Sequence, residues 1–148
     1  MNDSTARNLP IMHWLIAGGG LLWNLIGLAL YAMTVSATPE ALLTAYGGDD
    51  AKVDYVLSIP VWATAANALA VTAGVLACGL LLAKRALAAT AFLVSIAGLV
   101  VMDVHAFVLN NAVALFGAFP AVLQGAVFLI QVALFLYTKN LDKKGELT

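Results

Sequence analysis

Charged side chains are scarce in this sequence, and their scarcity narrows the class of protein. Of its 148 residues, 10% are Asp, Glu, Lys or Arg and 63% are hydrophobic. A soluble domain carries roughly 25% charged residues. Because so little polar surface cannot cover a water-soluble globule, we expect an integral membrane protein whose main partner is the lipid bilayer.

Other absences exclude whole classes of function. With a net charge of −1, the chain lacks the basic balance of a nucleic-acid-binding protein, so nucleic acid is excluded as a partner. The single cysteine, Cys78, allows neither an internal disulfide nor a thiol-pair redox site. His13 and His105 have no carboxylate pair beside them, so we expect no metal site. The chain also has no phosphate-binding loop and no nucleophile with a base at motif spacing. We therefore expect no catalytic residues, no cofactor and no enzyme activity.

Four segments are long and apolar enough to cross the hydrocarbon core as helices, which takes about 20 mostly apolar residues. Porin-like strands alternate apolar and polar residues, whereas these segments are apolar nearly throughout. The sequence therefore predicts an all-α fold, an integral membrane four-helix bundle in a single domain over residues 1–148. The predicted spans are residues 11–34, 59–83, 86–109 and 117–138.

The first span shares two features with a secretory signal. Arg7 precedes it, and Val35-Ser36-Ala37 resembles a cleavage site. A signal has an apolar region of about 7 to 15 residues, and this one is longer. We therefore expect a retained membrane helix.

Basic residues predict the orientation, because Lys and Arg concentrate in cytoplasmic loops. An even number of spans brings six of the seven to one face, and Lys52 lies on the other among four acidic residues. Both termini are therefore predicted to be cytoplasmic. The six basic residues are Arg7, Lys84, Arg85, Lys139, Lys143 and Lys144, and the four acidic residues are Glu40, Asp49, Asp50 and Asp54.

The loop over residues 35–58 is the only long connection, and it should contain one short helix at the outer membrane surface. Thr38-Pro39-Glu40 is typical of a helix start, with a capping hydroxyl, a proline at the first position and an acid near the positive end of the dipole. Gly47-Gly48 should end the helix. Leu42, Leu43 and Tyr46 would then lie on one side. Such a helix is either a cap on the bundle or a functional lid.

Polar side chains recur along one stripe of each span, which is how membrane helices pack together. At 1.5 Å per residue, Asn24, Asn67, Asp103 and Gln124 all fall roughly 20 to 25 Å from the cytoplasmic side. They should form one polar layer in the outer half of the bilayer, with Gln131 alone and deeper. The candidate ligand-binding residues are Asn24, Asn67, Asp103, Gln124, His105, Tyr31 and Thr64.

Asp103 requires the most explanation, because an ionisable group within a membrane helix is by default a functional hypothesis. Its predicted partners are Asn24, Asn67, Gln124 or His105. It could equally reach water at the outer interface. Hydrogen bonding between helices alone would account for the amide side chains.

Two segments carry a resemblance to a known family. The first is Trp23-Asn24-Leu25-Ile26-Gly27, which continues through Tyr31 and Met33. The second is Ser58-Ile59-Pro60-Val61-Trp62-Ala63-Thr64-Ala65-Ala66. With the leucine run ending at Lys84-Arg85, they resemble a family of small four-helix bacterial inner-membrane proteins of unknown activity, some labelled sugar transporters. The resemblance extends from Trp23 to the fourth span and implies the same four-helix fold in a bacterial inner (plasma) membrane.

Two functions remain open from the sequence. The chain is either a small-molecule binding or transport module with a polar site in the outer half of the bilayer, or a non-catalytic accessory subunit. The carboxylate at Asp103 favours the first. The shallow polar layer, and spans with no break of the kind that forms transporter sites, favour the second. Under either hypothesis the chain could form a homo-oligomer or join a larger membrane complex.

Overall fold

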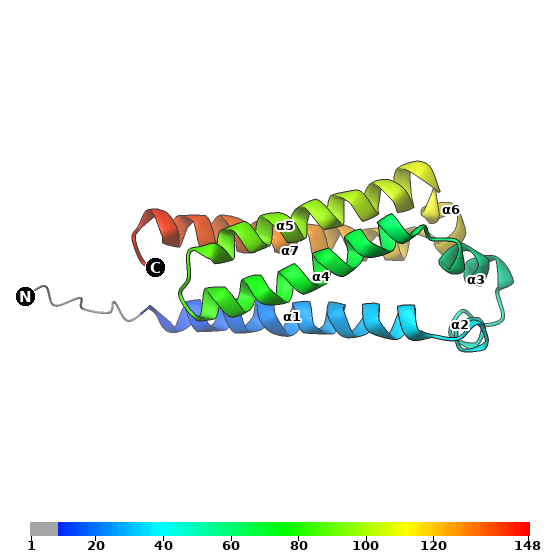
Figure 1. The fold of residues 1–148 in the computed structure, drawn as a ribbon, viewed down its shortest axis with the longest axis horizontal. Coiled ribbons are helices and arrows are strands. Elements are labelled where there is room, and N and C mark those ends of the chain that lie inside the picture. Colours follow the sequence, from blue (N-terminus) through cyan, green and yellow to red (C-terminus); the bar gives the residue numbers. More distant parts are fainter. Residues whose placement is uncertain (1–8) are drawn as a thin grey trace, which may run out of the picture.

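The computed structural model describes residues 9–148, so Arg7 lies outside the described residues. Four long helices lie side by side along one axis (Figure 1). All four are long and apolar enough to cross a membrane, as in a multi-pass membrane protein. They are α1 (Ile11–Ser36), α4 (Val61–Leu82), α5 (Leu87–Asp103), which continues as the π-helical turn η1 (Val104–Leu109), and α7 (Ala118–Lys143). The predicted all-helical membrane bundle is confirmed.

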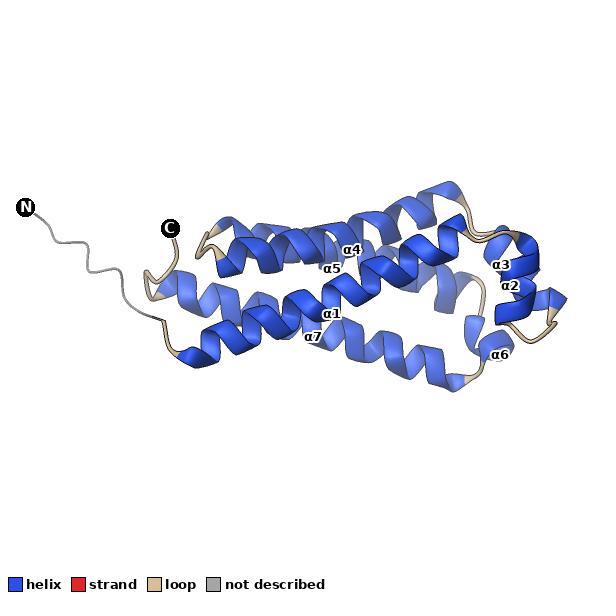
Figure 2. Ribbon diagram, turned by 90° about the horizontal axis from the view of Figure 1, so that it is seen from below, coloured by secondary structure: helices blue, strands red, loops and turns tan. Residues whose placement is uncertain are grey.

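The four helices follow one another around the bundle in the order α1, α4, α5, α7. Helix α4 packs most closely on α5, and the seam between α7 and α1 is the loosest. The described residues near the two termini lie at one end, called here the terminal end, and the short helices lie at the other, called here the loop end (Figure 1). Viewed from below, α1 crosses α7 near the middle and the two diverge toward the loop end (Figure 2).

The terminal half of the bundle holds a packed apolar core. Phe92 and Leu81 are fully buried, and Leu134 and Leu141 of α7 pack in the same cluster. The last residue, Thr148, donates its backbone N–H to the Lys84 carbonyl at 2.8 Å, and its own carbonyl accepts from the N–H of Ala86 at the same distance. The end of the chain is thereby tied to the turn between α4 and α5.

Helices α4 and α5 approach closely because Gly98 has no side chain. A Cβ at Gly98 would lie 2.6 Å from the carbonyl oxygen of Ala66 and 3.0 Å from the Cβ of Ala70. Ser95, one turn earlier on the same face, donates from Oγ to the Ala70 carbonyl at 2.7 Å. Small residues that let two backbones approach are typical of membrane helix pairs.

The loop end is more elaborate than the sequence predicts. The expected helix is present as α2 (Pro39–Ala45), capped by the Thr38 hydroxyl and followed by Gly47 and Gly48 in the left-handed region. A second helix that the sequence does not predict, α3 (Asp50–Leu57), follows it, with Asp49 accepting from the backbone N–H of Lys52. A third short helix, α6 (Ala112–Phe116), precedes α7.

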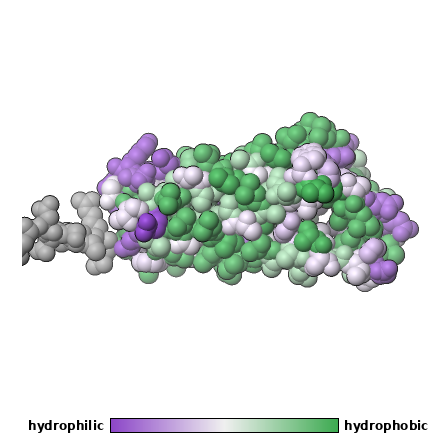
Figure 3. Space-filling model, in the orientation of Figure 1, coloured by the Kyte–Doolittle hydropathy of each residue, from purple (hydrophilic) through white to green (hydrophobic). Residues whose placement is uncertain are grey.

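The outer surface of the bundle suits a lipid environment. Along its length the face shown in Figure 3 is mostly apolar, and the hydrophilic residues gather at the two ends. Large apolar side chains such as Leu22, Leu69, Val108 and Leu129 are more than half exposed. In lipid this exposure costs nothing, since acyl chains are as apolar as leucine.

Candidate functional site

The structure divides the predicted polar layer between two places. Asn67, Asp103 and Gln124 line one pocket at the loop end. Asn24 instead lies closer to the terminal end, hydrogen-bonded to Gln131. The expectation that Gln131 stands alone is therefore wrong. Helix α7 runs to Lys143, five residues past the predicted end of the span, and this places Gln131 at the depth of Asn24.

Asn24, Ser95 and Gln131 form a hydrogen-bonded chain, called here the core network. Gln131 Nε2 donates to Asn24 Oδ1 at 2.6 Å and to Ser95 Oγ at 3.1 Å. Asn24 Nδ2 donates to the Gly20 carbonyl at 2.9 Å, and Ser95 donates to Ala70 of α4. All three side chains are buried and all four long helices take part. A buried network of this kind holds helices in register.

Gly74 of α4 makes room for the core network. A Cβ at Gly74 would collide with Asn24 Oδ1 and would lie 2.6 Å from Gln131 Nε2. The two amides can meet over the α4 backbone only because nothing projects from it there. The core network therefore accounts for Asn24 as a structural residue.

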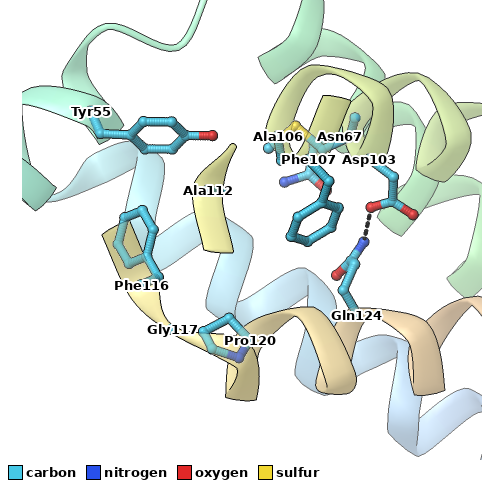
Figure 4. A pocket seen from close by; sticks show the side chains of 11 residues that line it. Tyr55, Asn67, Asp103, Ala106, Phe107, Ala112, Phe116, Gly117, Pro120 and Gln124 are labelled. Carbon is cyan, nitrogen blue, oxygen red and sulfur yellow. Dashed lines mark hydrogen bonds between the residues drawn. The ribbon is translucent and has the colours of Figure 1, made fainter. Parts of the chain in front are cut away.

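The second polar site is a cavity of about 200 Å³ at the loop end, called here the loop-end pocket. It lies among α3, α4, the junction of α5 with η1, α6 and the start of α7 (Figure 4). The lining residues are Tyr55, Asn67, Met102, Asp103, Ala106, Phe107, Ala112, Phe116, Gly117, Pro120 and Gln124.

Asp103 and Gln124 lie together on one side of the loop-end pocket (Figure 4). Gln124 Nε2 donates to Asp103 Oδ1 at 2.8 Å, and Asp103 Oδ2 takes no part in this bond. Both side chains are half-buried. Of the partners predicted for Asp103, the structure gives it Gln124, and it places Asn67 in the same cavity without a bond between them.

Tyr55 and Phe116 close the opposite side. Their rings meet edge to face, with centroids 5.3 Å apart. The Tyr55 hydroxyl is buried, has no hydrogen-bond partner among residues 9–148, and points across the pocket toward Phe107 (Figure 4). Burial raises the pKa of this phenol. Within the described part of the chain, the loop-end pocket thus has an uncommitted hydroxyl facing a carboxylate–amide pair.

The π-helical turn η1 shapes the pocket wall. It begins directly after Asp103 and contains Ala106 and Phe107, both of which line the cavity. Asn110 Nδ2 donates to the His105 carbonyl at 2.8 Å, and Asn111 then turns the chain in the left-handed conformation. Single π turns inside α-helices are frequent at functional sites.

The remaining three candidates lie outside the loop-end pocket. His105 is 5% exposed and meets the Trp62 ring edge to face at 5.3 Å. The Tyr31 hydroxyl donates to the backbone carbonyl of Thr64 at 3.4 Å, which links α1 to α4. These contacts give His105, Tyr31 and Thr64 packing roles between helices.

Sequence reasoning overlooked the aromatic lining of the pocket, which consists of Tyr55, Phe107 and Phe116. A signal for Tyr55 was present, because Gly47-Gly48 followed by Asp49 is typical of one helix ending and another beginning. In the structure the Lys52 side chain bonds to Asp49 and holds the pKa of that carboxyl below its ordinary value.

In the sequence, Phe107 and Phe116 look like ordinary apolar residues, and only the packing shows that they line a cavity.

Comparison of the chain with protein-family models, with curated proteins and with solved structures finds no match. The family resemblance drawn from Trp23–Gly27 and Ser58–Ala66 therefore remains a prediction.

Proposed function

We propose that this protein is a small integral inner-membrane protein that binds a small molecule in the loop-end pocket, from the outer side of the membrane. The observation that carries the proposal is the Asp103–Gln124 pair, which borders a cavity whose other polar groups, Asn67 and the Tyr55 hydroxyl, come from separate helices. Convergent polar groups in a mainly apolar cavity are typical of a ligand site.

The distribution of basic residues supports the proposed orientation. Lys84 and Arg85 lie in the turn at the terminal end, and Lys139, Lys143 and Lys144 lie at the end of α7. The positive-inside rule then places the terminal end in the cytoplasm and the loop-end pocket on the outer side. A reporter fused after Thr148 should be active in the cytoplasm, and one inserted near Gly48 should be active outside. Cytoplasmic activity from the Gly48 insertion would contradict this orientation.

Binding has more support than passage through a single chain. Between the loop-end pocket and the terminal end lie the core network and the fully buried Leu81 and Phe92. A solute moving inward would have to break bonds that join all four helices. We therefore propose a binding module, with transport requiring further copies or a partner.

The test is thermal unfolding of the purified protein in detergent, across a set of small polar metabolites. Asp103→Asn keeps the shape of the side chain and removes its charge, so it should fold normally and lose the stabilisation that a ligand gives the parent. Asp54→Asn is the matched control, because Asp54 is exposed on α3 and does not line the pocket. Equal ligand stabilisation of the parent and Asp103→Asn, for every compound, would contradict the proposal.

A second candidate function, an accessory subunit, is favoured by a groove on the loose seam between α1 and α7. Trp23 and Leu30 of α1 line it together with Leu123 and Val127 of α7, and Gln131 also lines it, with Oε1 unpartnered among the described residues. A partner helix with an apolar face would fit this groove. Leu123→Trp should fill the groove and release such a partner, detected by native mass spectrometry, while leaving ligand stabilisation unchanged.

A further inference from the structure

The charge of the loop-end pocket indicates what kind of ligand it would accept. Asp103 and Tyr55 are its only ionisable lining residues, and no Lys, Arg or His is among the described residues that line it. The nearby Lys52 is paired with Asp49, Nζ to Oδ2, at 3.1 Å. Asp103 is half-buried, and a carboxylate in a mainly apolar pocket attracts a cation. Residues 9–148 supply Asp103 with an amide donor but with no cation.

The aromatic lining complements the same charge. Tyr55 and Phe116 lie on the side of the cavity away from Asp103 and Gln124, and the Phe107 ring lies beside that pair (Figure 4). Aromatic faces carry partial negative charge and attract cations that lie over them. Alkylated ammonium groups suit such walls, because their methyl groups are apolar while the charge remains.

The size of the pocket sets a limit on the ligand. Its volume of about 200 Å³ holds roughly seven water molecules at about 30 Å³ each. A molecule of about five to seven heavy atoms fills that space. Sugars and nucleotides are larger, so the volume favours a compact ion.

We infer that the ligand is a small organic cation, an alkylated ammonium compound, held between the Asp103 carboxylate and the Phe116 ring, with the Phe107 ring beside the carboxylate. The Tyr55 hydroxyl, unpartnered in the described residues, is placed to bond a polar substituent of that ligand. This inference rests on the proposed function, because it names the ligand class of the same pocket.

The test compares choline with its uncharged carbon isostere, 3,3-dimethylbutan-1-ol, by isothermal titration of the full-length protein in detergent. The two probes have nearly the same shape and the same hydroxyl, so a difference in Kd reports the charge. Choline should bind at least about tenfold more tightly, and Asp103→Asn should remove that advantage. Asp54→Asn, with the same change of charge outside the pocket, should retain it.

Aromatic variants test the second half of the site. Phe107→Leu and Phe116→Leu should each weaken choline binding by roughly threefold. Phe119→Leu is the control, since Phe119 is 77% exposed and does not line the pocket. Two aromatic variants are used because Phe116 also packs on Tyr46 and Tyr55. Choline affinity unchanged in both would overturn the aromatic contribution.

The outcomes separate the two proposals. Equal binding of choline and the isostere, with both weakened by Asp103→Asn, would overturn the cation inference and leave a neutral-ligand site at Asp103. If neither probe binds and no metabolite stabilises the protein, the proposed function falls as well.

Discussion

The two halves of this bundle use polar side chains in opposite ways. Toward the terminal end, Asn24, Ser95 and Gln131 are buried and bonded to one another and to backbone carbonyls. Toward the loop end, Asp103 and Gln124 are half-buried and border a cavity. Amide side chains from neighbouring helices therefore serve as a structural joint in one half and as pocket lining in the other. Both halves use amide side chains, so the difference between them lies in the packing around those side chains.

The largest expected effect comes from filling the space that the core network occupies. Gly74→Ala should lower the free energy of unfolding by about 3 kcal/mol, because the new Cβ separates two bonded amides. Gly79→Ala, on the same helix with nothing within 4 Å of its Cβ position, should be neutral or slightly stabilising. Unfolding in detergent measures both. Equal stabilities would contradict the buried network.

A matched pair on α7 compares the two halves directly. Gln131→Leu leaves Asn24 Oδ1 without its donor inside the bundle and should cost about 2 kcal/mol. Gln124→Leu removes the bond to Asp103, but that carboxylate is half-exposed and can bond water, so the cost should stay below about 1 kcal/mol. If Gln124→Leu were the more costly change, the Asp103–Gln124 pair would be a structural joint too.

Thiol labelling compares the water access of the core network with that of the loop-end pocket. Cys78 is fully buried beside the core network, and its thiol should resist a water-soluble thiol reagent in the folded protein. Asn67→Cys, in a Cys78→Ala background, places a thiol in the loop-end pocket and should react at least about tenfold faster. Mass spectrometry after timed labelling gives both rates. Slow labelling at position 67 would show that the pocket is closed to water.

The smallest effect should arise at the start of α3. Asp49 and Lys52 are both partly exposed. The Asp49 carboxylate caps the helix that carries Tyr55. Since pairing holds the pKa of Asp49 below its ordinary value, its contribution is complete above that value and is lost as the pH falls through the folded-state pKa. Asp49→Ala should speed hydrogen exchange in α3 at neutral pH and leave the core unchanged. Faster exchange in α4 and α5 as well would contradict a local role.

Part of the candidate site could be read from the sequence. Counting 1.5 Å per residue brought Asn67, Asp103 and Gln124 to one depth, and the structure places all three around one cavity. The same counting failed for Gln131, because it depends on where a helix ends and α7 extends beyond its apolar stretch. His105 was predicted to line the site because it lies on the polar stripe of its helix, but in the structure its ring packs on Trp62.

The sequence by itself determined the four membrane helices, because apolar length is a property of each segment alone. It also determined the start of α2, since capping and proline act within one turn. Only the tertiary structure decided which amides meet, where α4 needs Gly74, and that Phe107 and Phe116 line the same cavity as Asp103. Those outcomes depend on crossing angles and on the π-helical turn after Asp103. Both arise from contacts between segments distant in the sequence, which no local pattern records.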